Sequence, residues 1–145
     1  MNQTIDLNIS KKSAKAGDSI PHESAHLHVT GQATYIDDLP ELENTMHLAV
    51  GFSSCAKGKI SKFDLDAVRQ ADGVYAVFSA KDIEVENNWG PIVKDDPIFA
   101  EGQVEFYGQA LFVVVAESYQ QARQAVRLAK IEYVPETPIL TIQDA

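Results

Sequence analysis

Six consecutive apolar residues, Leu111 to Ala116, are followed almost at once by a helical pattern rich in alanine. A continuous apolar run of this length is typical of a strand that is covered on both faces. In the next segment Ser118 and Gln121 have the spacing of a capping box. The apolar stripe that follows at helical spacing consists of Ala122, Ala125, Val126 and Ala129. Because most of this stripe is alanine, the chain is expected to pack a helix very close to a central buried strand.

Four further strands and a short helix are predicted around this centre. The strands cover residues 44–54, 59–65, 74–79 and 131–135, and the helix covers residues 66–72. In the first strand Met46, Leu48 and Val50 alternate with other residues, which places these three side chains on one face.

The short helix and a long loop complete the order of elements. Asp66 is predicted to cap the helix, and Gly73 follows its C-terminal end. Residues 80–101 form a loop that contains Trp89, and loops of that length in compact domains are often functional or lie against a partner. The order of elements predicts an α+β fold, in which a mixed sheet has two main helices packed on it.

Composition excludes several classes of function. The net charge of −9 opposes binding to nucleic acid or to acidic membrane surfaces, and no stretch approaches the ~20 apolar residues of a membrane span. The single cysteine, Cys55, rules out an internal disulfide and fits a cytoplasmic location. Residues 1–18 are polar and lack the apolar core of a signal peptide. We therefore predict a disordered tail there and one domain over residues 19–145.

Three histidines, His22, His26 and His28, lie close together near the start of that domain. Residues from Val29 to Ile36 favour an extended segment, and on an extended chain the three imidazoles would project to the same side. Their spacing of four and then two residues fits neither a clean helical pair of ligands nor a complete zinc ligand set. A weak surface metal site is one interpretation. The other, which we favour, is solvated histidines in a polar segment that leads into a strand.

Other polar residues also have two interpretations. Gly108 and Gln109 precede the buried strand and could contact a cofactor, but a glycine bulge at the start of the strand is favoured. Glu117 could be a catalytic carboxylate, but an acidic residue near a helix N-terminus is the simpler account. Trp89 could anchor an interface or pack on its own domain.

Cys55 and its neighbours offer two further chemical candidates. Lys57 and Lys59 lie near Cys55 in sequence and would favour a thiolate if they were close, yet no signature of a cysteine nucleophile surrounds it. Lys57 could carry a biotinyl or lipoyl group, but a methionine usually lies beside such a lysine and none does here. Phosphate-binding glycine loops, Ser-His-Asp patterns and HExxH are absent. We therefore assign no catalytic, cofactor-binding or metal-ligating residue to this chain.

The motifs, taken in order, resemble a known family. The resemblance covers about residues 19–145 and rests on HESAHLHVTGQATYIDDLP, MHLAVGFSSCAKGKI, ADGVYAVFSAKDI, NNWGPIVKDDPIFAEGQVEFYGQALFVVVAES and AVRLAKIEYVPETPILTIQDA. In this order they are similar to the amino-terminal α/β-hammerhead domain of the molybdopterin-binding subunit in the xanthine dehydrogenase and aldehyde oxidase family.

This resemblance implies a function for a larger enzyme. In the family, a molybdenum centre on a molybdopterin cofactor hydroxylates hypoxanthine and xanthine to urate with oxygen from water. Electrons then pass through two 2Fe–2S clusters and FAD to NAD. The residues that contact the pterin lie in later parts of the subunit, and the clusters and FAD belong to a partner subunit. The chain is therefore expected to be an inactive structural domain of a cytoplasmic oxidoreductase of purine catabolism, cut from a polypeptide that continues beyond Ala145.

The substrate and the contact surface are narrower expectations. At the position of Phe52, Ser53 and Cys55, aldehyde oxidases more often resemble the pattern RSPHAHARI. These three residues depart from that pattern, and this favours xanthine as the substrate. The loop over residues 80–101, with Trp89, is the candidate contact with the rest of the molybdenum subunit and with the FAD/iron–sulfur subunit. The alternatives are the same domain of an aldehyde oxidase or another molybdenum hydroxylase, and a stand-alone carrier or binding module.

Overall fold

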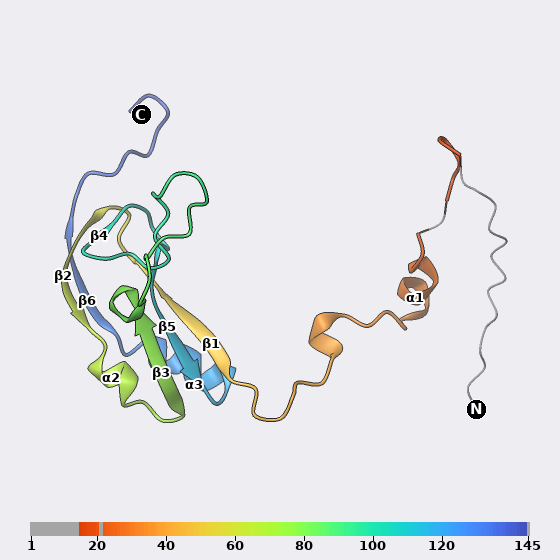
Figure 1. The fold of residues 1–145 in the computed structure, drawn as a ribbon, viewed down its shortest axis with the longest axis horizontal. Helices are drawn as coiled ribbons and strands as arrows, with labels where there is room; N and C mark the ends of the chain where they lie inside the picture. The colour runs from red at the N-terminus through yellow and green to blue at the C-terminus, as the bar shows by residue number, and fades with distance from the viewer. Residues whose placement is uncertain (1–14, 21, 145) are drawn as a thin grey trace. The chain divides into compact units, whose positions relative to one another are not determined.

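The computed structural model describes residues 15–20 and 22–144, and the chain divides into two compact units, Met1–Glu41 and Leu42–Ala145 (Figure 1). Most of the predicted tail over residues 1–18 lies outside the described residues. Within it, Lys15 and Asp18 close a turn, because the Lys15 N–H donates to the Asp18 carboxylate and the Asp18 N–H donates to the Lys15 carbonyl.

The first unit contains a helix where the sequence predicts an extended segment. The short helix α1 spans Ala25–Thr30, and a single 3-10 turn, η1, spans Ile36–Asp38. Gly31 ends α1 with φ of 70°, and the Thr30 hydroxyl donates to the His26 carbonyl. The extended prediction was wrong here because β-propensity reflects packing on a pleated neighbour, and no strand pairs with this segment among the described residues.

The second unit follows the predicted order of elements and adds one strand. Its elements are β1 (His47–Phe52), β2 (Gly58–Asp64), α2 (Asp66–Arg69), β3 (Val74–Ser79), η2 (Ala80–Asp82), β4 (Gln103–Val104), β5 (Ala110–Ala116), α3 (Tyr119–Val126) and β6 (Lys130–Pro135). The predicted long loop is largely irregular between η2 and β4. Strand β4 has only two residues, too few for a pattern of alternation to be visible in the sequence.

The strands form two three-stranded sheets, whereas the sequence predicts a single mixed sheet. The first sheet has the order β1-β5-β3 and the second has the order β4-β2-β6, and every pairing is antiparallel. Successive strands such as β1 and β2 therefore belong to different sheets. The α+β class is nevertheless the one predicted.

The core joins the two sheets with the helices α2 and α3. Phe112 of β5 packs edge-to-face against Phe63 of β2, with 6.2 Å between the ring centroids. The fully buried side chains around this pair come from α2, β4 and β5, and the largest are Phe112, Leu111, Val68, Val104 and Val114. The predicted central strand is thus confirmed, with one difference. Val113 and Val115 are only half-buried, so the far face of β5 is less covered than the apolar run predicts.

Helix α3 begins at the predicted cap and buries the predicted stripe. Ser118 is the N-cap, and its hydroxyl oxygen accepts a hydrogen bond from the Gln121 N–H. Ala122 and Ala125 are buried. Small side chains on this face let the helix lie close to β1 and β5, the two strands it contacts most.

Helix α2 is shorter than predicted and is capped differently. Leu65 occupies the N-cap position, while Asp66 lies in the first turn, and its N–H donates to the carboxylate of Asp64. Gly73 lies beyond the end of the helix with φ of 71°, and a Cβ at this position would lie 2.1 Å from the side chain of Gln121. The glycine is therefore favoured by its backbone conformation, whereas the Gln121 amide is the far end of a flexible side chain.

Candidate functional site

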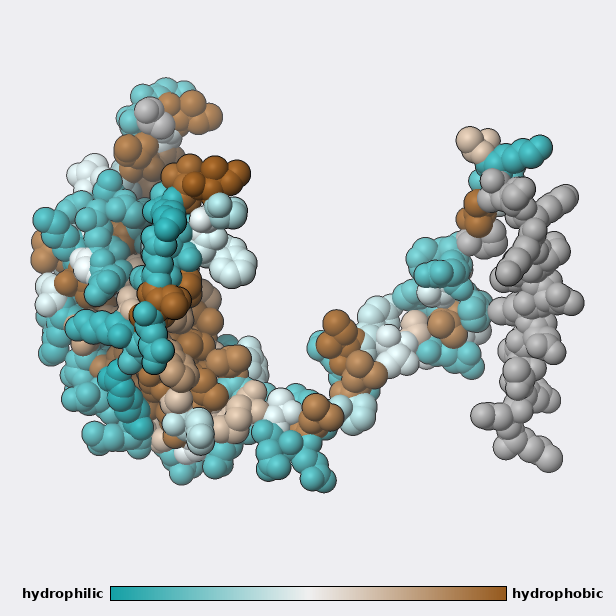
Figure 2. Space-filling model, viewed as in Figure 1, coloured by the Kyte–Doolittle hydropathy of each residue, from teal (hydrophilic) through white to brown (hydrophobic). Residues whose placement is uncertain are grey.

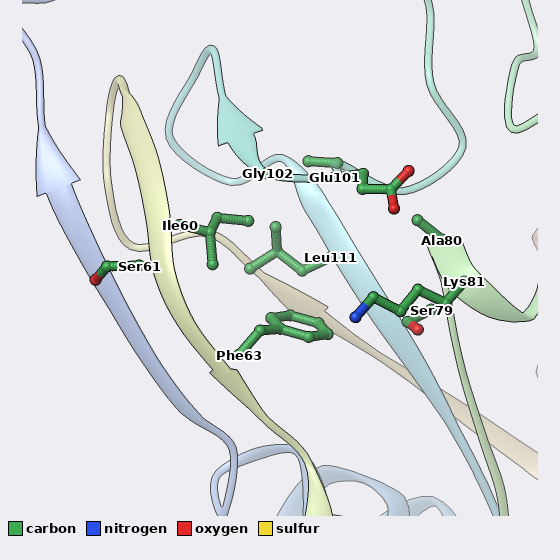
Figure 3. A pocket seen from close by; sticks show the side chains of 10 residues that line it. Ile60, Ser61, Phe63, Ser79, Ala80, Lys81, Glu101, Gly102 and Leu111 are labelled. Atoms are coloured by element: carbon green, nitrogen blue, oxygen red, sulfur yellow. The ribbon is translucent and has the colours of Figure 1, made fainter.

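A pocket of the second unit lies where the two sheets meet. It has a volume of about 390 Å³. In Figure 3 the apolar side chains of Ile60, Phe63 and Leu111 gather from β2 and β5, while Lys81 and Glu101 come from η2 and from the segment before β4. The remaining lining residues are small or polar: Ser61, Ser79, Ala80, Ala100 and Gly102. Sequence reasoning singled out none of these residues, because they lie on separate elements and carry no shared motif.

The polar groups of this pocket are engaged in local structure. The Ser79 hydroxyl and the Ser79 N–H both donate to Oδ2 of Asp82, each at 2.8 Å. These two hydrogen bonds hold the pKa of Asp82 below its ordinary value. A general base works best when its pKa is near the operating pH, and Asp82 is moved away from that range. The pair is thus a capping box that starts η2, rather than a nucleophile with its base.

Two of the three histidines of the first unit, His22 and His28, make local side-chain contacts. His28 lies within hydrogen-bond distance of the Tyr35 hydroxyl, at 3.0 Å from Nδ1, and Nδ1 of His22 accepts from the Ser24 N–H. The rings of His22 and His28 are 6.2 Å apart and tilted. No group of three or more His, Cys, Asp or Glu side chains among the described residues is placed to hold a metal ion. The segment is a helix, so the interpretation as a lead-in to a strand is wrong.

Gly108 and Gln109 form the turn that enters β5. Gly108 has φ of 85°, and the buried side chain of Gln109 accepts a hydrogen bond from the Glu105 N–H at 2.8 Å. The register of β5 shifts just after this turn, opposite Gly51 and Phe52. The favoured structural interpretation of a glycine irregularity at the start of the strand agrees with this geometry. Glu117 is exposed, and its N–H donates to the Gly73 carbonyl.

Cys55 and Lys57 are held by the segment between β1 and β2. The Cys55 thiol donates to the Lys57 carbonyl at 3.1 Å, and the Lys57 ammonium lies 3.8 Å from a Glu105 carboxylate oxygen. Its hydrogen-bond partner is thus a main-chain carbonyl and not a basic side chain. Because β1 and β2 belong to different sheets, Lys57 does not stand at the tip of a hairpin, which is where a carrier domain presents its modified lysine.

The donor groups of this chain do not fit the redox groups that the resemblance implies. An iron–sulfur cluster of the 2Fe–2S type needs several thiolates, and the sequence contains one cysteine. The pocket between the sheets offers one lysine, one glutamate and two serine hydroxyls beside the apolar side chains of Ile60, Phe63 and Leu111. We assign no cofactor-dependent step to these residues.

The outer surface of the second unit is unusually apolar. On the first sheet, Leu48 and Phe52 are each 59% exposed and Phe78 is 45% exposed. They lie on the same face as Val113 and Val115, as the register shows. Figure 2 shows hydrophobic residues gathered over the middle of this unit, where β1 and β5 lie in Figure 1. A contiguous exposed apolar surface is a candidate contact site.

Trp89 adds an aromatic side chain to the exposed apolar surface. It is 77% exposed and does not pack into the core of its own unit. Its loop is nevertheless structured, since the Trp89 N–H donates to the Asp96 carbonyl at 2.8 Å, and the amide side chain of Asn87 exchanges hydrogen bonds with the main chain of Phe99. None of the helices in the described ranges is both long and apolar enough to cross a membrane.

A known protein family matches most of the second unit. The family model described as "Aldehyde oxidase and xanthine dehydrogenase, a/b hammerhead domain" matches residues 30–137. Xanthine dehydrogenase from Drosophila subobscura is 38% identical over 86% of this chain, which corresponds to 9% of that protein. The chain therefore spans about a tenth of the length of the curated relatives it matches.

Solved structures share the fold. Quinoline 2-oxidoreductase from Pseudomonas putida 86 is 27% identical with a TM-score of 0.75, over 88% of this chain and 17% of that chain. The aldehyde oxidoreductase from Desulfovibrio desulfuricans is 30% identical with the same TM-score of 0.75, over 88% of this chain and 15% of that chain. The three related proteins act on different substrates according to their names, while the domain fold is common to them.

Proposed function

The chain belongs to the aldehyde oxidase and xanthine dehydrogenase family as its a/b hammerhead domain, and from this premise we propose that it is a structural domain of a molybdenum-dependent xanthine dehydrogenase. In this proposal the domain packs on the rest of the molybdopterin-binding subunit and helps to seat the FAD/iron–sulfur subunit. The complete enzyme, located in the cytoplasm, hydroxylates hypoxanthine and xanthine to urate and passes the electrons to NAD.

A single observation carries the structural role. The domain combines an ordinary buried core with a sheet face on which Leu48, Phe52 and Phe78 remain largely exposed. At about 25 cal/mol per Å² of apolar surface removed from water, covering such a face is favourable. At its pocket, by contrast, the Ser79 hydroxyl and the Asp82 carboxylate form a local capping box rather than a nucleophile with its base. These features support a packing module rather than a catalytic one.

The loop over residues 80–101 is the proposed contact with the neighbouring subunit. Trp89 presents a large exposed aromatic surface on a loop that internal hydrogen bonds already order. Tryptophan is enriched among the residues that dominate binding energy at protein interfaces. An ordered loop also loses less conformational freedom on binding than a disordered one.

Xanthine is the proposed substrate of the complete enzyme, and an aldehyde is the second candidate. A xanthine dehydrogenase is 38% identical to this chain and a nicotinate hydroxylase is 36% identical, so identity does not separate the substrates. The preference for xanthine rests on the segment around Phe52, Ser53 and Cys55. The domain itself contacts no substrate in this proposal, so the two candidates share one structural role.

Substrate profiling of the complete enzyme tests the proposed activity. The native polypeptide that carries this domain is purified with its associated subunits and supplied with NAD and with hypoxanthine, xanthine, an aliphatic aldehyde or an N-heterocycle in turn. Reduction of NAD that depends on hypoxanthine and xanthine is expected. If the enzyme oxidised aldehydes and neither purine, the proposed activity would change from xanthine dehydrogenase to aldehyde oxidoreductase. The proposed structural role of the domain would not change.

A further inference from the structure

The first sheet ends at β1, whose outer edge has no strand partner in the part of the chain described. In an antiparallel pair, alternate residues direct their N–H and C=O groups toward the neighbouring strand and away from it. The Ser53 N–H donates to the Gln109 carbonyl at 2.8 Å, so Ser53 is directed toward the β5 side. The alternation therefore directs the main-chain groups of Leu48, Val50 and Phe52 to the outer edge.

This edge carries fewer protecting features than the edges formed by β4 and β6. Free strand edges are usually blunted by short length, charged residues, proline or irregular register. Strand β4 has two residues, and β6 contains Lys130, Glu132 and Pro135. Strands β1 and β3 each have six residues and one register shift. Strand β1, with the sequence HLAVGF, contains no lysine, arginine, aspartate, glutamate or proline. Its main chain is available for pairing with another strand.

A groove runs along this edge between β1 and α3. Its volume is about 480 Å³, and β1 lines it with Leu48, Ala49, Val50 and Phe52. From α3 and the residue that follows come Tyr119, Arg123, Val126 and Arg127. A groove between an edge strand and a helix is the geometry in which an extended peptide adds to a sheet.

The two arginines of the groove set the charge of its occupant. Among the described basic residues, Lys57, Lys62, Arg69 and Lys94 each form an ion pair, whereas Lys59, Lys81 and Lys130 form none with the described residues. Arg123 and Arg127 form no ion pair with the described residues, although Arg123 lies over the ring of Tyr119 at 5.6 Å. An occupant that covered both guanidinium groups without supplying carboxylates would leave charges desolvated and unpaired. An acidic occupant is therefore favoured, even though the chain as a whole is strongly acidic.

We propose that β1 receives an added strand from the remaining polypeptide of the same enzyme: an extended, acidic segment whose main chain pairs with the outer edge of β1. Its carboxylates lie opposite Arg123 and Arg127, and its apolar side chains continue the face formed by Leu48 and Phe52. This inference rests on the proposed function, in which the domain is part of a much longer chain. The length of the curated relatives, of which this chain covers about a tenth, shows how much polypeptide is available as the donor.

Photo-crosslinking in the complete enzyme tests the proposal. The substitution Phe52→p-benzoylphenylalanine places a photoreactive ring in the groove with little change of shape, and mass spectrometry identifies the segment that it captures. The expected product is an intramolecular link to an acidic segment. A link to a separate subunit, a link to a segment without acidic residues, or no link at all would each overturn the proposal. The control Tyr75→p-benzoylphenylalanine, on the opposite edge strand, is expected not to capture that segment.

Charge reversal tests the role of the two arginines. In the Phe52→p-benzoylphenylalanine enzyme, the pair Arg123→Glu and Arg127→Glu is expected to lower the crosslink yield about tenfold, because attraction is replaced by repulsion. The pair Arg123→Lys and Arg127→Lys keeps the charge and is expected to keep most of the yield. Arg69→Glu on α2 is the matched control outside the groove. An unchanged yield in the double glutamate variant would overturn the assignment of an acidic occupant.

The same preparation separates failure of this inference from failure of the proposed function. If the enzyme contains molybdenum and oxidises xanthine but gives no crosslink from residue 52, the added strand is contradicted and the proposed function is not. If the preparation gives the expected crosslink but contains no molybdenum, the proposed function is contradicted and the added strand is not.

Discussion

The ring of Phe112 occupies the space in which a side chain of residue 51 would begin. Gly51 and Phe112 are directly opposed in the register of β1 and β5, and a Cβ on Gly51 would lie 2.1 Å from Cε1 of Phe112. On its other side the Phe112 ring meets Phe63 of the second sheet. The absence of a side chain on β1 thus allows one aromatic residue to join the two sheets.

Gly51→Ala is expected to destabilise the chain by about 1 to 3 kcal/mol, the usual cost of overpacking a core. The added methyl group must displace a ring that belongs to a residue only 1% exposed. The midpoint of urea unfolding measures the loss. The double variant Gly51→Ala with Phe112→Leu is expected to lose less than the sum of its single changes, because the smaller side chain relieves the clash.

Gly102→Ala is the control for the Gly51 substitution. Gly102 has φ of 72° but nothing within 4 Å of the added Cβ, so only the backbone conformation is penalised, by about 1 to 2 kcal/mol. Additive losses in the Gly51 and Phe112 double variant would contradict the proposed steric conflict, whatever the size of each single loss.

Removal of the α3 cap is expected to lower stability. Ser118→Ala takes away the acceptor for the Gln121 N–H and is expected to cost about 1 kcal/mol, whereas Ser118→Asp keeps an acceptor and is expected to cost less. Thermal unfolding of both variants measures the difference. If aspartate proved as damaging as alanine, the hydroxyl oxygen would not be acting as a cap.

The Ser79–Asp82 capping box should make stability sensitive to acid. Hydrogen bonds from the Ser79 hydroxyl and N–H lower the pKa of Asp82 in the folded chain, so the folded state binds this proton more weakly than the unfolded state. The contribution is therefore complete above the ordinary carboxyl pKa and is lost as pH falls through the lowered value.

Carboxyl NMR titration of Ser79→Ala measures this effect. The variant keeps the N–H donor and loses the hydroxyl, so the pKa of Asp82 is expected to rise part of the way toward its ordinary value. Asp82→Asn is expected to reduce the dependence of the unfolding free energy on pH below neutrality. A pKa for Asp82 that is the same in Ser79→Ala as in the wild type would show that the hydroxyl has no part in the shift.

Much of the second unit could be predicted from local pattern. The residues that define β3, β5, β6 and α3 carry their signals within a few positions: a short apolar run, a Ser118 cap and an alanine stripe. Division of the strands into two sheets could not be predicted in the same way. Pairing of β5 with both β1 and β3 depends on contacts across the chain, and period-two alternation does not specify a partner.

The candidate surfaces were harder to predict than the core. The apolar run of β5 predicts burial on both faces, yet Val113 and Val115 are only half-buried. A sequence shows which side chains favour burial, but it does not show which neighbouring element covers them. In the sequence, Arg123 and Arg127 are indistinguishable from ordinary solvated residues in and just after a helix. They gain meaning only from their position beside the outer edge of β1. Trp89 was singled out from its loop, and its exposed side chain agrees with that choice.

Trp89→Ala is expected to weaken association of the complete molybdenum subunit with its FAD/iron–sulfur partner. Truncation of a central interface tryptophan commonly costs about 2 kcal/mol or more, which corresponds to a dissociation constant raised roughly thirtyfold. Sedimentation or calorimetry of the purified subunits measures the change. Val85→Ala, on the same loop and also exposed, is the control that should bind normally. If Trp89→Ala and the wild type bound the partner with equal affinity, the loop would not be part of the interface.

Molybdenum content provides the most direct test of the central claim, that this chain is a structural part of a molybdenum enzyme and holds no redox group itself. Metal analysis is made on the purified 145-residue chain and on the native polypeptide that carries it. We expect close to one molybdenum per native polypeptide, with xanthine-dependent reduction of NAD, and neither metal nor turnover in the chain alone. Stoichiometric molybdenum or turnover in the chain alone, or a native polypeptide without molybdenum, would contradict this claim.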